Sequence, residues 1–165
     1  MQPMVRTFRT LPIALLLASC LTLTACKSGP PKPQVLKLSI TVSADANPDG
    51  QNRPSPIVIR IYQLKDDGAF KDADFFALYD KEQATLAASL ISRQEFEVAP
   101  GAQKVADYQV SPDARFVGIA AGYRNIRDAV WRAQIGSQDK GVAGIAKKKK
   151  LNVSAGRASV TVSAE

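Results

Sequence analysis

Strict alternation of apolar and polar residues constrains the fold of this chain more than any other feature. The side chains of Leu36, Leu38, Ile40 and Val42 alternate with Lys37, Ser39, Thr41 and Ser43. A two-residue period puts alternate side chains on opposite faces of an extended chain, so it predicts a strand with one buried face. Residues 57–64 repeat the pattern through Ile57, Ile59 and Ile61. The chain is therefore expected to form sheets around a core.

Further short strands follow, separated by residues that favour turns. The patterns predict strands at residues 94–98, 104–110, 115–123, 131–135, 148–153 and 158–162. We expect 94–98 and 104–110 to be partners around Pro100-Gly101, and the last two strands to pair around Ala155-Gly156. Eight short strands with turn-rich connections are typical of a mainly β fold, the two-sheet β-sandwich.

One segment departs from the two-residue period. Apolar residues between Asp72 and Leu90 have the spacing of one or two short helices, for which Asp72 and Asp80 are candidate N-caps. We expect the large aromatic residues to lie in the core: Phe75, Phe76, Tyr79 and Trp131. The prediction is a β-sandwich domain over residues 35–165 with a helical excursion at 72–90.

The N-terminal segment has the features of a secretory signal. Arg6 and Arg9 precede an uncharged run, residues 11–25, which is shorter than the roughly 20 residues of a membrane span. Its end, Leu-Thr-Ala-Cys26, resembles the lipobox of bacterial lipoproteins, which implies that residues 1–25 are removed and that Cys26 carries N-acyl and S-diacylglycerol lipid. Cys20 is a competing match, but cleavage there would leave an apolar mature N-terminus. A retained helix or a disulfide between the two cysteines is the remaining alternative.

The residues after Cys26 bear on the destination of the protein. By resemblance to lipoprotein sorting rules, an Asp in the next position retains a lipoprotein in the inner membrane, so Lys27 favours the outer membrane. The acyl chains would then lie in its inner leaflet, on the periplasmic side. Residues 26–34 contain three prolines and are expected to form an extended tether, at roughly 3 Å per residue.

Composition limits the chemistry that the chain can perform. The 165 residues include no His and two Cys, which excludes Ser-His-Asp and Cys-His catalysis and imidazole ligands. Glu95 and Glu97 share a strand face, where solvated carboxylates are common, although spacing alone permits a glycosidase pair. Residues 45–50 match the opening of an EF-hand loop, but the twelfth position is Pro56 instead of Glu, which favours a turn. We expect no enzymatic activity, no metal, no cofactor other than the lipid and no small-molecule substrate.

The basic excess is concentrated in one place. Lys and Arg number 22 against 15 Asp and Glu, for a formal charge of +7, and four of these cations are consecutive at Lys147–Lys150. This run could contact anionic lipid headgroups or discourage aggregation along an edge strand. A secreted protein is not expected to bind nucleic acid.

Three segments resemble the outer-membrane lipoprotein of the type VI secretion system, the TssJ (SciN/VasD) family. They are residues 50–64, with Arg-Pro-Ser-Pro before the strand Ile-Val-Ile-Arg-Ile-Tyr-Gln-Leu, residues 70–79, with Ala-Asp-Phe-Phe-Ala-Leu-Tyr, and residues 118–132. The resemblance implies a transthyretin-like sandwich of two four-stranded sheets. It also implies a structural subunit that tethers the secretion complex to the outer membrane by binding the periplasmic C-terminal region of TssM, and through TssM contacts TssL indirectly.

In that family the loop between the first two strands contacts TssM, which implies a binding loop at residues 44–56 here. Asn47, Asp49, Gly50 and Gln51 are expected at its tip, and Arg53 is its only cation. Guanidinium forms bidentate pairs with carboxylates, although Arg53-Pro54-Ser55-Pro56 could also serve only to direct the chain into the next strand. Without the three segments, the sandwich and the lipobox would equally permit a generic periplasmic chaperone or a peptidoglycan-binding lipoprotein.

Overall fold

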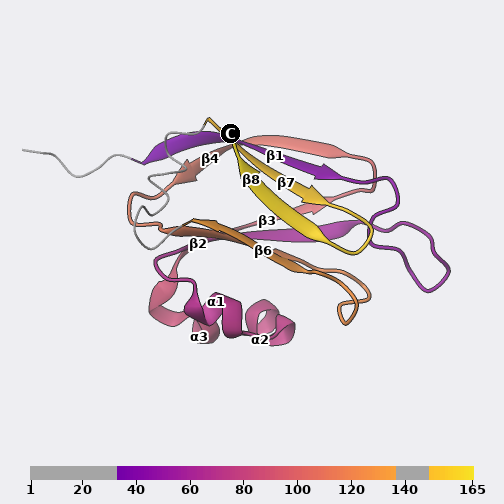
Figure 1. The fold of residues 1–165 in the computed structure, drawn as a ribbon, viewed down its shortest axis with the longest axis horizontal. Helices are drawn as coiled ribbons and strands as arrows, with labels where there is room; N and C mark the ends of the chain where they lie inside the picture. Colours follow the sequence, from indigo (N-terminus) through magenta and orange to yellow (C-terminus); the bar gives the residue numbers. More distant parts are fainter. Residues whose placement is uncertain (1–32, 137–148) are drawn as a thin grey trace, which may run out of the picture. The chain divides into compact units, whose positions relative to one another are not determined.

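The computed structural model describes residues 33–136 and 149–165, most of a compact unit that extends from Lys32 to Glu165. Two four-stranded sheets lie face to face (Figure 1). One has the strand order β4-β1-β7-β8 and the other β3-β2-β5-β6. The strands are β1 Gln34–Val42, β2 Ile57–Leu64, β3 Leu90–Val98, β4 Gln103–Val110, β5 Phe116–Ala121, β6 Arg132–Gly136, β7 Lys150–Ala155 and β8 Val160–Ala164. The predicted sandwich of eight strands is confirmed.

The core fills the space between the two sheets. Alternate residues of β1 and β2 point into it, as the two-residue period predicted, and Ile40, Ile57, Ile59 and Ile61 are fully buried. Strand β5 is buried on both faces along its length. Its outer face is covered by the helical segment, so the sheet that contains β2 and β5 is the middle layer of this part of the molecule.

The helical segment packs on the outer face of the β3-β2-β5-β6 sheet (Figure 1). It comprises α1 Gly68–Asp72, α2 Phe75–Asp80, α3 Glu82–Leu86 and a 3-10 turn, Ala87–Ser89. The predicted N-caps are wrong, because Asp72 and Asp80 are the last residues of α1 and α2. The carboxylate that caps α2 belongs to Asp74, which accepts a hydrogen bond of 2.8 Å from the N–H of Ala77.

Phe75, Phe76 and Tyr79 form a surface cluster and do not enter the main core, contrary to the sequence-based expectation, whereas Trp131 is half-buried and packs against the main core as well. The ring of Phe75 stacks on Tyr79 with centroids 4.9 Å apart and meets the edge of Trp131 at 5.2 Å. Phe76 leans on Phe75 yet is 62% exposed. Arg60, on β2, covers the other side of this cluster with its guanidinium 3.6 Å from the Tyr79 ring centroid.

The strands on either side of Pro100-Gly101 do not pair with each other, which corrects a second expectation. Strand β3 pairs with β2, whereas β4 pairs with β1 in the other sheet. Gly101 adopts a φ of 75° and donates to the carbonyl of Ser43, and the N–H of Val42 donates to the carbonyl of Ala102. The turn is therefore bonded to the end of β1, and it carries the chain from one sheet to the other.

The C-terminal strands pair as predicted, but the lysine run does not begin an edge strand. β7 and β8 form an antiparallel pair, and β7 also pairs in parallel with β1. Lys150 therefore enters an interior strand of its sheet, beside Lys37 of β1. Lys147 and Lys148 lie outside the described residues, as do the signal segment, Cys26, Lys27 and most of the tether.

Gly118 offers a test of how the helical segment is attached to the sheet. A Cβ atom at this position would lie 2.7 Å from the ring of Phe70, which is fully buried against β5. Gly118→Ala should therefore displace Phe70 and destabilise the fold by about 1–3 kcal/mol, as overpacking does elsewhere. Urea unfolding measures this loss. Gly50→Ala is the control, since its Cβ would meet no atom within 4 Å, and equal stability of the two variants would contradict the packing described.

Candidate functional site

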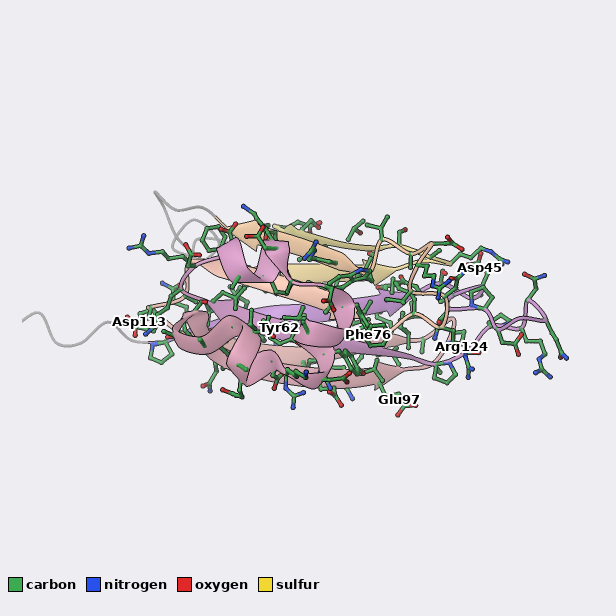
Figure 2. The ribbon with its side chains drawn as sticks, turned by 90° about the horizontal axis from the view of Figure 1, so that it is seen from below. Asp45, Tyr62, Phe76, Glu97, Asp113 and Arg124 are labelled. Carbon is green, nitrogen blue, oxygen red and sulfur yellow. The ribbon has the colours of Figure 1, made fainter. Side chains whose placement is uncertain are left out.

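The loop between β1 and β2 forms one end of the sandwich. It lies at the same end as residues 122–131 and the β7–β8 turn, and Figure 2 shows Asp45 and Arg124 there, far from Asp113 at the other end. Strand β1 begins beside Val110, close to Asp113, because Gln34 pairs with Val110. The chain therefore enters the sandwich at one end and presents this loop at the other, roughly 26 Å away at the usual rise of a strand.

Asp49 organises the outer part of the loop. Its Oδ1 accepts hydrogen bonds from the N–H groups of Gln51 at 2.8 Å and Arg53 at 3.0 Å, and its Oδ2 lies 2.7 Å from the guanidinium of Arg53. The N–H of Asp49 donates in turn to the carbonyl of Arg53 at 2.9 Å. This is a closed Asx-type turn, which agrees with the turn interpretation of residues 45–50 and commits the Asp49 carboxylate to donors of the chain itself.

These donors also set the charge state of the turn. The backbone N–H of Arg53, followed by its guanidinium and the N–H of Gln51, holds the pKa of Asp49 below its ordinary value of 3.8. A lowered pKa means that the folded turn favours the carboxylate. Its stabilising contribution is therefore complete above that ordinary value and is lost only as the pH falls through the lowered one.

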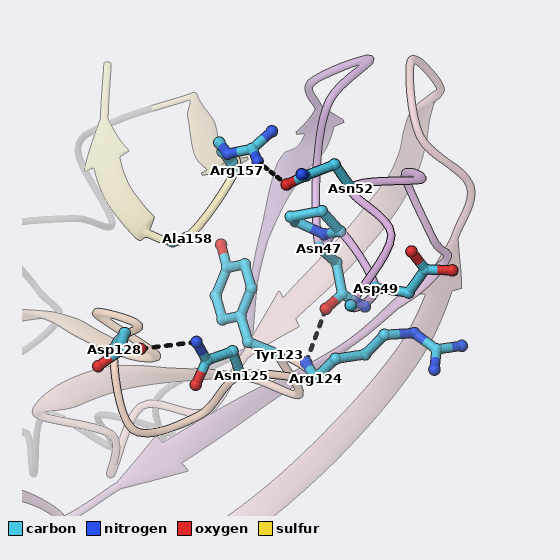
Figure 3. A pocket seen from close by; sticks show the side chains of 11 residues that line it. Asn47, Asp49, Asn52, Tyr123, Arg124, Asn125, Asp128, Arg157 and Ala158 are labelled. Atoms are coloured by element: carbon cyan, nitrogen blue, oxygen red, sulfur yellow. Dashed lines mark hydrogen bonds between the residues drawn. The ribbon is translucent and has the colours of Figure 1, made fainter.

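Asn47 joins the loop to its two neighbours. The side chain is 3% exposed, and its Oδ1 accepts from the N–H of Arg124 at 2.7 Å (Figure 3). Its Nδ2 donates to the carbonyl of Pro56 at 2.7 Å. Its own N–H donates to the carbonyl of Arg157 at 3.2 Å. The residue adopts a φ of 49°, a conformation that Asn tolerates better than most residues. A single buried amide therefore fixes three segments that are distant in sequence.

A hollow of about 490 Å³ opens between these three segments (Figure 3). Its lining includes Asp49 and Asn52 of the loop, Tyr123, Arg124, Asn125 and Asp128 of the second segment, and Arg157 of the third. Burial raises the pKa of Tyr123 to about 12, so its hydroxyl stays protonated at neutral pH and donates to the carbonyl of Gly156 at 3.3 Å. The hollow thus has a neutral aromatic wall and charged groups around it.

The predicted binding residues occupy different positions in this arrangement. Gly50, Gln51 and Arg53 are exposed at the outer turn, whereas Asn47 is buried at its base. Asp49 is partly exposed; it belongs to the turn and also lines the hollow. Arg53 is already paired with Asp49, since its Nε and one Nη lie 2.8 and 2.7 Å from the same oxygen, Oδ2. Arg124 and Arg157 were missed by the sequence analysis, because nothing local to residues 122–131 or 156–159 indicates that they meet the loop.

The comparison with protein-family models gives one match. The T6SS-SciN model, described as type VI secretion lipoprotein (VasD, EvfM, TssJ), matches residues 34–158. The chain belongs to this family. The matched range includes strands β1 to β7, the helical segment and every residue that lines the hollow, so the site lies within the part that defines a type VI secretion lipoprotein.

Solved structures support the assignment. TssJ1, the type VI secretion lipoprotein of Pseudomonas aeruginosa, is 27% identical with a TM-score of 0.71, covering 81% of this chain and 98% of that one. Lip of Serratia marcescens, a membrane-bound component of the type VI secretion system, is 26% identical with a TM-score of 0.70, covering 81% and 99%. A chain of a type VI membrane complex is 25% identical with a TM-score of 0.68, covering 80% and 99%. No curated protein sequence matches significantly.

In residues 33–136 and 149–165, no three His, Cys, Asp or Glu side chains lie close enough to hold a metal ion. No helix in the same residues is long and apolar enough to cross a membrane. The site itself consists of an ordered turn, a hollow and several arginines.

Replacing Asn47 tests whether one amide holds the site together. Asn47→Gly keeps the positive φ without strain but removes two buried hydrogen bonds, so it should lower the free energy of unfolding by about 1–3 kcal/mol. Chemical denaturation measures the difference. Asn52→Gly is a matched control in the same loop, since Asn52 has a φ of 61° but is exposed. A loss no larger for Asn47→Gly than for Asn52→Gly would refute the clamp.

Proposed function

We propose that this type VI secretion lipoprotein is a structural subunit that tethers the secretion system's membrane complex to the outer membrane by binding the periplasmic C-terminal region of TssM. The observation that carries the proposal is the family match over residues 34–158. The binding residues proposed are Asp49, Gly50, Gln51 and Arg53 of the outer turn, with Asn47 as the residue that positions them. TssL is an indirect partner, through TssM.

The family and its neighbours support a role in an assembly. One similar chain comes from a structure of a type VI membrane complex. Another, 24% identical with a TM-score of 0.63 and covering 79% of this chain and 98% of that one, comes from a structure described as the TssM C-terminal domain from EAEC; at that identity the likeness concerns the fold. The choice of TssM and of the first loop rests on the resemblance in residues 50–64, 70–79 and 118–132.

The course of β1 supports the tethering geometry. In the proposal, Cys26 carries the lipid, Lys27 directs the protein to the outer membrane, and a short tether leads to Gln34 at the start of β1. The loop follows the other end of β1, so it would project away from the anchored end and into the periplasm. A rigid turn on a sandwich loses little entropy on docking, which suits a binding loop.

The test separates the anchor from the contact. Cys26→Ala should remove the protein from the outer-membrane fraction and abolish secretion, because no acyl chain is attached. Replacing residues 49–53 by a Gly/Ser segment of equal length should leave the protein at the membrane but weaken its binding to the TssM periplasmic domain. Fractionation and calorimetry are the two measurements. Pro112 and Asp113, replaced by Gly-Ser at the opposite end, provide the matched control for binding.

Each half of the proposal can fail separately. Cys26→Ala protein that remains in the outer-membrane fraction would reject the anchor. Wild-type protein with no affinity for the TssM domain would reject the tethering function itself. Unchanged affinity after replacement of residues 49–53, or an equal loss in the control at Pro112 and Asp113, would place the contact on another surface.

A further inference from the structure

We infer that the hollow beside the first loop binds an acidic segment of the partner protein, with Arg124 as the residue that recognises a carboxylate. The inference rests on the proposed function, since it names the chemistry by which the same site would hold its partner. It assigns a role to a residue outside the loop, in the segment between β5 and β6.

Arg124 is the arginine of the hollow whose guanidinium is not engaged. Its side chain is exposed, and among residues 33–136 and 149–165 it forms no hydrogen bond and no ion pair. The other two arginines nearby are engaged: Arg53 pairs with Asp49 at 2.7 Å, and Arg157 donates to the Oδ1 of Asn52 at 2.7 Å. A guanidinium has five donors in a planar fork. Arg124 can offer all five to a ligand, and Arg157 can offer those that do not bind Asn52.

The carboxylates around the hollow do not neutralise Arg124. Asp49 already accepts from two N–H groups and from Arg53, and Arg124 only adds a distant attraction, the smallest of the influences on the Asp49 pKa. Asp128 accepts from the side-chain amide of Asn125 at 2.7 Å. Both acids are thus bonded within the chain, and the charged donors left for a partner are the guanidinium groups of Arg124 and Arg157.

The backbone holds Arg124 in place before any partner arrives. Its N–H donates to the buried side chain of Asn47, whose own N–H donates to the carbonyl of Arg157. Both arginines therefore extend from backbone fixed to the same residue, on two sides of one hollow (Figure 3). Preorganised donors lose little entropy on binding, and arginine binds planar carboxylates through two parallel hydrogen bonds.

The size of the hollow indicates a peptide segment as the occupant. Its volume of about 490 Å³ falls in the usual range of ligand sites, about 300–1,000 Å³, which is more than one carboxylate side chain fills. The polar amides of Asn52 and Asn125 and the ring of Tyr123 also line it. An Asp or Glu within a polar loop of the partner would pair with Arg124 while its neighbours contact these groups.

Substitutions of Arg124 test the inference, with Arg127 as a matched control. Arg127 is an exposed arginine of the same segment that does not line the hollow. Binding of the full mature chain to the TssM periplasmic domain is measured by calorimetry at several salt concentrations. Arg124→Ala should raise the Kd at least about tenfold and reduce its salt dependence, as loss of a central interface arginine does. The Kd of Arg124→Lys should fall between those of the wild type and Arg124→Ala, because Lys keeps the charge but lacks the planar fork of donors. Arg127→Ala should change the Kd less than about twofold.

A charge exchange identifies the class of ligand. Asp and Glu of the TssM domain are replaced one at a time by Arg, and one such variant should lose affinity for the wild-type chain and regain it with Arg124→Glu. If the wild-type chain binds the TssM domain and Arg124→Ala binds it with the same Kd and the same salt dependence, this inference is overturned and the proposed function stays intact. Loss of affinity for vesicles of anionic phospholipid in Arg124→Ala, with TssM binding unchanged, would assign the arginine to a membrane surface and overturn it as well.

Discussion

The proposed binding end of this molecule is organised around one buried amide. Asn47 connects the first loop to the segments after β5 and β7 through two side-chain hydrogen bonds and one from its own N–H. A buried polar side chain is tolerated only where its donors and acceptors are satisfied, and then it specifies one arrangement of its neighbours. The bond from Arg157 to Asn52 and the bond from Tyr123 to Gly156 also join these segments, but Asn47 is the residue that binds all three and fixes the backbone of both arginines.

Local patterns in the sequence predicted the strands of the sandwich, because burial of one face imposes a two-residue period on each strand separately. Strand β2 begins and ends at the residues that the alternating pattern predicted, and the short turn between β7 and β8 predicted their pairing. Relations between distant elements were not predictable in this way. The crossing of the chain at Pro100-Gly101 depends on which sheet offers a partner to β4. The exposure of Phe76 depends on which face of α2 packs on the sheet, since Phe75 is the residue that contacts Trp131 and Tyr79.

The candidate site shows the same division between local and distant information. The turn around Asp49 could be anticipated, because Asp and Gly within a few residues favour an Asx turn. The pairing of Arg53 inside that turn, the burial of Asn47 and the presence of Arg124 required the fold. Arg53, the arginine expected to meet a partner, is already bound within the loop, and the proposal gives that role to Arg124, whose side chain forms no bond within residues 33–136 and 149–165.

The most direct test of the account is the footprint of the TssM periplasmic domain on this protein, measured by hydrogen exchange with and without the domain. The proposed site predicts that protection on binding is concentrated in residues 47–53 and 122–125, at the end of the sandwich opposite Gln34. Protection confined to the helical segment, residues 68–89, or to the edge of β4, with these two loops unchanged, would contradict it.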